Sequence, residues 1–248
     1  MHDGTIFRTA SIGAYLMTRF ARVVAVDVPH HVTQRGNARQ FILATEADCK
    51  VYMDLLRQNL ELDSLALLGY CLMSNHVHLI LVPEKVDALG RALKDTHGRF
   101  AAYWNATRHS TGHVWQGRFY SCPLDEQHLW EALRYTELNP VRAGLRADAE
   151  RWEWSRAGAH CGLREAGSLT MDPWRAKWSV ADWRAFLSAG DSESGLAAIR
   201  QCTHTGRPLG AAPFIRTLER KTQRSLTAQR RGRPRKVTAD DRQSSLSF

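Results

Sequence analysis

Residues 65–83, LALLGYCLMSNHVHLILVP, consist of two apolar runs on either side of Ser74 and Asn75. Each run has the length of a strand, and a short polar break between two such runs is typical of a tight turn. We therefore expect residues 65–73 and 76–82 to pair as an antiparallel hairpin. The other predicted elements are arranged around this hairpin.

Extended and helical patterns alternate on both sides of it. Upstream, a Val-rich segment predicts a strand after Pro29, and apolar residues at helical spacing predict a helix over 46–61 with Thr45 as its N-cap. Downstream we expect a helix over 87–105, a strand over 118–124 and a helix over 125–138 that ends at Asn139-Pro140. This order predicts an α+β fold, most simply a ferredoxin-like antiparallel sheet with its helices on one face.

His76 and His78 are two residues apart in the second strand of the hairpin. Side chains alternate between the two faces of a strand, so both imidazoles are expected on the same face. Two imidazoles on a rigid strand can supply two ligands to a divalent metal ion. The alternative is that both are structural histidines on a half-exposed sheet face.

Tyr135 and Asn139 are four residues apart near the end of the predicted helix over 125–138, so they share a helix face. A tyrosine phenol can attack a phosphodiester and form a phosphotyrosine, and an asparagine amide oxygen can serve as a third metal ligand. A tyrosine on an amphipathic helix more often packs in the core. The pair gains significance only if the helix end lies across the strand that carries the two histidines.

Several cations and rings are candidates for contact with nucleic acid. Trp115, Arg118, Phe119 and Tyr120 interleave cations with aromatic rings, as in proteins that stack single-stranded bases on aromatic side chains. Ordinary sheet packing is the alternative interpretation. Within the folded domain, we expect Arg35, Trp115 and Arg118 to contact DNA.

The positive charge is concentrated near the C-terminus. The segment 216–236 contains nine Lys or Arg and one acid, and so accounts for +8 of the net charge of +9. A basic arm beside a nearly neutral domain gains affinity for polyanions by releasing counterions from phosphates. Within it, Arg231-Gly232-Arg233-Pro234 is similar to an AT-hook, so Arg231 and Arg233 are expected to contact a minor groove. A solubilising tail is the alternative.

Changes in composition along the chain suggest four segments. After about Trp154, isolated tryptophans stand among Gly, Ser and Ala, which favours short helices packed on the main domain. We expect an N-terminal extension over 1–19, a main domain over 20–156, a small helical extension over 157–224 and a basic, disordered tail over 225–248.

Several classes of protein are disfavoured by composition and by the lack of their motifs. No apolar stretch approaches the roughly 20 residues that span a bilayer. The five cysteines are scattered without a CxxC, which favours a reducing cytosol. The sequence contains no Walker loop, GxSxG or GxGxxG. We expect a cytoplasmic protein without a membrane partner.

Four segments in order resemble a known family. PHHVTQRGN (29–37), LMSNHVHLILVP (72–83), WQGRF (115–119) and RYTELNPVRAGL (134–145) are similar to motifs of the single-tyrosine HUH transposases. Their order and spacing resemble the REP-associated branch of these bacterial enzymes, and TGRPLG (205–210) with the basic RGRPRK (231–236) resembles its C-terminal region.

The resemblance implies roles for particular residues. Tyr135 would be the nucleophile, and His76, His78 and Asn139 would hold Mg or Mn. It implies action on single-stranded DNA beside hairpins such as repetitive extragenic palindromes (REPs), through a 5′-phosphotyrosine intermediate, in a bacterial cytoplasm at the nucleoid. Thr136 replaces a more usual branched apolar residue, and Ser74 replaces a common proline.

Two other functions remain open at the level of sequence. A domesticated regulator would bind hairpin DNA without cutting it, although such a protein has no chemical need for the full set of four site residues. A metal-dependent hydrolase of small phosphoesters would need acidic ligands near His76 and His78, and the strand contains none. We expect a monomer, with a homodimer as the alternative.

Overall fold

The computed structural model describes residues 22–167 and 170–227. The expected N-terminal extension, most of the expected basic tail and the AT-hook residues Arg231 and Arg233 lie outside these ranges. Within them, no helix is long and apolar enough to cross a membrane.

Four strands form one antiparallel sheet in the spatial order β2-β3-β1-β4. Their bounds are β1 His30–Arg35, β2 Leu65–Met73, β3 His76–Pro83 and β4 Tyr120–Pro123. The expected hairpin is the pair β2 and β3, joined through Ser74 and Asn75. This order is that of a ferredoxin-like sheet, so the α+β fold predicted from the sequence is confirmed.

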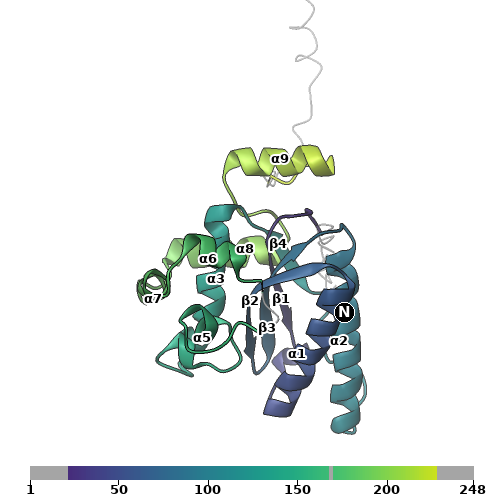
Figure 1. Cartoon of the computed structure of the whole chain (residues 1–248). Helices are drawn as coiled ribbons and strands as arrows, with labels where there is room; N and C mark the ends of the chain where they lie inside the picture. The colour runs from purple at the N-terminus through teal and green to yellow at the C-terminus, as the bar shows by residue number, and fades with distance from the viewer. Residues whose placement is uncertain (1–21, 168–169, 228–248) are drawn as a thin grey trace, which may run out of the picture.

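The two helices α1 (Glu46–Leu62) and α2 (Ala88–Thr107) cover one face of the sheet (Figure 1). Helix α1 begins where the sequence predicts, because Thr45 accepts a hydrogen bond from the backbone of Asp48 and Asp48 accepts one from the backbone of Thr45. Apolar side chains of both helices pack against Val77, Leu79 and Leu81 of β3 in the larger core cluster.

The opposite face is covered as well, which the expectation of helices on one face did not include (Figure 1). Helix α3 (Glu126–Glu137) lies against this face, and Asp125 caps its first turn. Side chains alternate between the two faces along a strand, and Ile80 and Cys122 lie on this second face. The sheet therefore has apolar side chains on both faces. The helix does not simply stop at Pro140, because a one-turn helix α4 (Asn139–Arg142) follows and holds this proline in its first turn, where proline is tolerated.

The remaining helices pack around α3 and β4. They are α5 Ala157–His160, α6 Asp172–Lys177, α7 Val180–Ser188, α8 Glu193–Thr205 and α9 Ala212–Thr222, with short 3-10 turns η1 at Asn37–Arg39 and η2 at Ala149–Arg151. Helix α8 contacts both β4 and α3, whereas α9 packs on the segment around Val23 and Ala25 beyond one end of the sheet (Figure 1).

Candidate active site

The site begins with the pairing of the two central strands. In the antiparallel register, Thr33 lies opposite His78 and Arg35 lies opposite His76. Residues two apart share a face, so His31 lies on the same face as these four residues. The sheet therefore gathers three histidines on the face that α3 covers.

Helix α3 approaches this face closely enough to place Tyr135 beside the histidines. The centroid of the Tyr135 ring lies 5.5 Å from that of His78 and 5.6 Å from that of His31, and both contacts are edge-on. The close approach depends on Gly69 of β2, because a Cβ at that position would lie 2.3 Å from the Cδ2 atom of Leu133. Because Gly69 has no side chain, α3 can pack closely against β2 at Leu133, two residues before Tyr135.

The side-chain amide of Asn139 is held by the end of α3. Its Nδ2 atom donates to the carbonyl oxygens of Tyr135 and Thr136, each at 3.1 Å. The amide oxygen takes no part in these bonds, and Asn139 lines the same pocket as Tyr135, His76 and His78. The site therefore contains an amide oxygen that can act as an acceptor or a metal ligand.

His76 and His78 are held in a form suited to metal binding. Burial, together with the nearby charge of Arg35, lowers the pKa of His76 to about 4. Burial also lowers the pKa of His78 well below its ordinary value, reinforced by neighbouring His76 and His31. Both rings are neutral near pH 7, as a metal-bound imidazole must be. Their centroids lie 5.0 Å apart.

Hydrogen bonds at the Nδ1 atoms leave the Nε2 atoms of both rings for another partner. Nδ1 of His76 lies 2.6 Å from Oδ1 of Asn75, which accepts its proton, and Nδ1 of His78 lies 2.9 Å from Nε2 of His31. Among the described residues, no three His, Cys, Asp or Glu side chains are grouped so that they could hold a metal ion. Two imidazoles and an amide fit a weak divalent site whose other ligands come from a substrate.

Two guanidinium groups lie near the ring of Tyr135. The Cζ atom of Arg142 is 4.3 Å from the ring centroid, and that of Arg200 is 6.0 Å away. Arg142 also donates to the carbonyl oxygen of Tyr135 and to Asp191. Arg200 is exposed and lines the pocket, so its charge is available to an anion beside the phenol.

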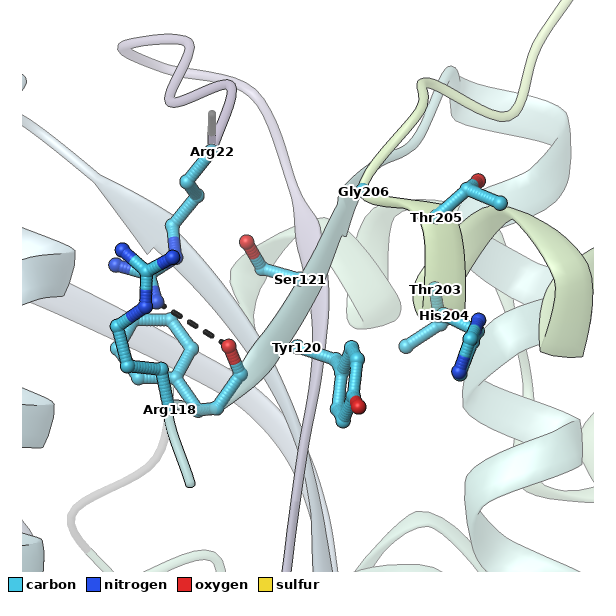
Figure 2. Close-up of a pocket in the computed structure, with 9 residues that line it drawn as sticks. Arg22, Arg118, Tyr120, Ser121, Thr203, His204, Thr205 and Gly206 are labelled. Atoms are coloured by element: carbon cyan, nitrogen blue, oxygen red, sulfur yellow. Dashed lines mark hydrogen bonds between the residues drawn. The ribbon is translucent and has the colours of Figure 1, made fainter. Parts of the chain in front are cut away.

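Tyr135, Asn139, Arg200 and the three histidines line one pocket of about 550 Å³, whereas Arg142 lies outside it. It draws residues from β1, β3, β4, α3, α4 and α8. Helix α8 contributes Arg200, Thr203 and His204, and the ring of His204 stacks on that of Tyr120 with centroids 5.1 Å apart. Figure 2 shows this pair facing each other across the gap between β4 and α8.

The last part of α3 is anchored by the helices that follow it. Glu137 is fully buried and accepts hydrogen bonds from Nδ1 of His160 and from the indole of Trp183, the latter at 2.9 Å. Asp191 accepts from Arg134 and Arg142 on either side of the Tyr135 turn. The position of Tyr135 is thus set by the C-terminal helices as much as by the sheet.

The structure brings together five of the residues expected to function, namely Arg35, His76, His78, Tyr135 and Asn139. Trp115 is not among them. Its side chain is buried in the core, where its indole donates to the carbonyl oxygen of His97 and its ring packs on Tyr52 and Phe100. This burial favours core packing over the base stacking expected of Trp115.

Arg118 lies outside the pocket that holds Tyr135. It lines a neighbouring pocket together with Arg22 and Phe119 (Figure 2). There the Arg22 guanidinium lies 3.5 Å above the Phe119 ring.

The sequence did not predict a role for His31, Arg200 and Thr203 of the pocket, or for Arg142 beside the Tyr135 ring. The period of a strand could have indicated His31. It lies two residues before Thr33 and four before Arg35, so all three share one strand face. Arg142 lies within the segment 134–145 and one turn after Leu138. Arg200 and Thr203 lack any such signal, since nothing local indicates which sheet face α8 will meet.

Comparisons with known proteins support the family and the fold. Residues 25–139 match the family model of the IS200-like transposases. The solved structure of a REP-associated tyrosine transposase bound to a REP hairpin is similar in fold, with a TM-score of 0.51 and 16% identity over 66% of this chain and 92% of that one.

A candidate transposase from Deinococcus radiodurans gives a TM-score of 0.34 and 20% identity, over 48% of this chain and 95% of that one. No curated protein sequence matches this chain. Of the two solved structures, only the REP-associated transposase is similar enough to establish a shared fold.

Proposed function

Since this chain belongs, through residues 25–139, to the IS200-like transposase family, as its motifs predicted, we propose that it cleaves and rejoins single-stranded DNA with Tyr135 as nucleophile. The observation that carries this proposal is the shared pocket, in which the Tyr135 ring lies beside His78 and the Asn139 amide. Phenol, imidazoles and amide can thus reach one phosphate group.

The chemistry is a transesterification at phosphorus. The phenol oxygen of Tyr135 loses its proton and forms a bond to phosphorus, and the bond to the 3′ oxygen of the preceding nucleotide breaks. The products are a 5′-phosphotyrosine and a free 3′-hydroxyl, which takes up a proton. A later attack by a 3′-hydroxyl reverses the step, because the phosphotyrosine retains the energy of the bond. The positive charges of Arg142 and Arg200 lie near the Tyr135 ring, where they stabilise the negative charge of the phosphate and of the developing phenolate.

His76, His78 and Asn139 are the residues that would hold a divalent metal, through two Nε2 atoms and one Oδ1 atom. When bound, Mg or Mn would act as a Lewis acid on a phosphate oxygen and orient the phosphorus towards the phenol. The donor set carries no negative charge, so we expect the affinity to be low until DNA phosphate contributes oxygen ligands. The chain's own task is to hold the two neutral imidazoles and the amide oxygen on one wall of the pocket.

The proposed substrate is a hairpin such as a REP with adjacent single-stranded DNA. A solved relative of similar fold is bound to a REP hairpin. In this chain Arg35 lines the pocket, Arg118 is exposed beside it, and the basic segment with Arg231 and Arg233 follows. We propose that the protein acts as a monomer, with a homodimer as the alternative.

The test is a search for the covalent intermediate. The protein is incubated with an end-labelled hairpin oligonucleotide that carries single-stranded flanks, in Mg or Mn, and products are separated under denaturing conditions. We expect a protein–DNA adduct with the wild type and none with Tyr135→Phe, while both bind the hairpin equally in a native gel. An adduct with the Phe variant would show that Tyr135 is misassigned. Hairpin binding without any adduct from the wild type would favour the non-cutting regulator.

A further inference from the structure

Three buried side chains form a continuous hydrogen-bond chain behind the proposed metal ligands. Nδ1 of His78 lies 2.9 Å from Nε2 of His31, and Nδ1 of His31 lies 2.8 Å from Oγ1 of Thr203. The two rings stack with an interplanar angle of 9° and a centroid distance of 5.2 Å. None of the three residues is more than 4% exposed, so water does not compete for these bonds.

The chain couples the tautomers of its two imidazoles. A neutral imidazole has one N–H donor and one acceptor nitrogen, so both bonds of His31 must run in the same direction. If His78 donates from Nδ1, His31 accepts at Nε2 and donates from Nδ1 to Thr203. In that direction Nε2 of His78 is left with a lone pair, and His78 lines the pocket. In the reverse direction Nε2 of His78 carries the proton and cannot bind a metal.

Thr203 reaches this position from α8, a helix outside the residues that match the transposase family model. Figure 2 shows Thr203 on α8 alongside β4, next to His204. The helix is fixed there by contacts with β4 and α3. The C-terminal helices of this chain therefore supply a buried hydroxyl to the interior of the sheet domain, 172 residues after His31.

We propose that Thr203 is a positioning residue whose hydroxyl accepts the Nδ1–H of His31, and that this direction of the chain fixes the tautomer and the ring orientation of His78. The consequence for metal binding rests on the proposed function of His78 as a ligand. Outer-shell partners of a ligating histidine act in this way in many metal sites, because they determine which nitrogen presents its lone pair. Here the outer shell has two members, and the second one comes from the C-terminal extension.

The first test needs no metal and no DNA. Nitrogen-15 NMR of the histidine rings reports which nitrogen of His78 carries the proton, in the wild type, in Thr203→Val and in Thr203→Ser. Valine has the shape of threonine without the hydroxyl, so the fold is expected to persist, and thermal unfolding checks this. We expect the Nδ1–H tautomer of His78 in the wild type and in the Ser variant. In the Val variant, we expect a large population with the proton on Nε2.

A wild-type His78 that carries its proton on Nε2 would overturn the proposal. So would a Val variant with the same His78 tautomer as the wild type. Either result stands whether or not the protein binds metal.

The second test measures the Mn affinity of the same three proteins by calorimetry with the hairpin oligonucleotide present, because DNA phosphate is expected to supply the missing oxygen ligands. We expect Thr203→Val to bind Mn about tenfold more weakly, the lower end of the effect of outer-shell substitutions, and Thr203→Ser to recover most of the loss. Equal affinities for the wild type and the Val variant would contradict the consequence for metal binding. If the wild type binds no Mn even with the hairpin DNA present, the proposed function of His78 fails, and the NMR result still decides the role of Thr203.

Discussion

The ring of Tyr135 lies edge-on to the ring of His78, with 5.5 Å between their centroids. One comes from near the end of α3 and the other from a central strand of the sheet, 57 residues earlier in the chain. Between them they form one wall of the pocket that Arg200 and Asn139 complete. Metal ligands, anchoring contacts, burial and close packing each contribute to this wall.

The proposed metal ligands and the nucleophile have separable roles. His76→Ala removes one imidazole and should weaken Mn binding by at least about tenfold, and it should also abolish the adduct. Tyr135→Phe should abolish the adduct and leave Mn binding unchanged, because the phenol is not among the proposed ligands. Calorimetry with Mn and the adduct assay on both variants check this. Equal Mn affinity of His76→Ala and the wild type would remove His76 from the ligand set.

Asp191 should couple the C-terminal helices to the helix that carries Tyr135. It is 7% exposed as a side chain and bonds Arg142 at 2.5 Å and Arg134 at 3.3 Å. Removing one partner leaves the other charge poorly compensated, so a double-mutant cycle of Asp191→Asn and Arg142→Gln should give a coupling of about 1–3 kcal/mol in urea unfolding. We expect slower adduct formation in each single variant. Strictly additive effects on unfolding would contradict the coupling.

Stability should fall as the solution becomes acidic. Burial lowers the pKa of His30 to about 4 and that of His97 to about 3, whereas both titrate near 6.5 in an unfolded chain. Between pH 6.5 and about 4 the unfolded state therefore binds protons that the folded state does not, and the free energy of unfolding decreases with decreasing pH. Each histidine contributes a slope of roughly 1.4 kcal/mol per pH unit in this range.

Urea unfolding at several pH values measures that slope. His97→Gln should make it shallower, because one of the buried titrating groups is gone, even though the substitution also lowers stability at pH 7. The prediction is contradicted by a His97→Gln variant whose unfolding free energy changes with pH as steeply as that of the wild type.

Gly69 should matter for catalysis although it lies outside the pocket. Gly69→Ala places a Cβ against Leu133 and should shift α3, with a cost of about 1–3 kcal/mol. Because Tyr135 moves with α3, adduct formation should slow more than hairpin binding weakens. Gly98→Ala is the matched control, since a Cβ there meets no atom within 4 Å, and it should be neutral or stabilising in its helix. Equal effects of the two substitutions would exclude the packing role of Gly69.

Much of the fold was predictable because its determinants are local. The hairpin of β2 and β3 follows from two apolar runs and a two-residue break, and the first turn of α1 follows from Thr45 and Asp48. The pairing of His76 with His78 on one face needs only the period of a strand. Their neutral state and the Nδ1 partner of His78 were not predictable, because the first depends on burial and the second comes from another strand.

Trp115 illustrates the opposite case. Its neighbours in sequence, Arg118 and Tyr120, suggested a surface for stacking bases, yet its ring packs among Tyr52, His97 and Phe100. Local composition does not determine which side of an irregular loop is covered. That depends on where α1 and α2 meet the loop.

The sequence by itself determined the four strands, the helices α1 to α3 and the residue types of the site, because period, caps and turns within short segments define them, and the order of these elements along the chain predicted the ferredoxin-like sheet. Only the tertiary structure decided that α8 lies against β4 and presents Arg200 and Thr203 to the histidines. The physical reason is separation along the chain. His31 and Thr203 meet across 172 residues through packing contacts that no local pattern encodes.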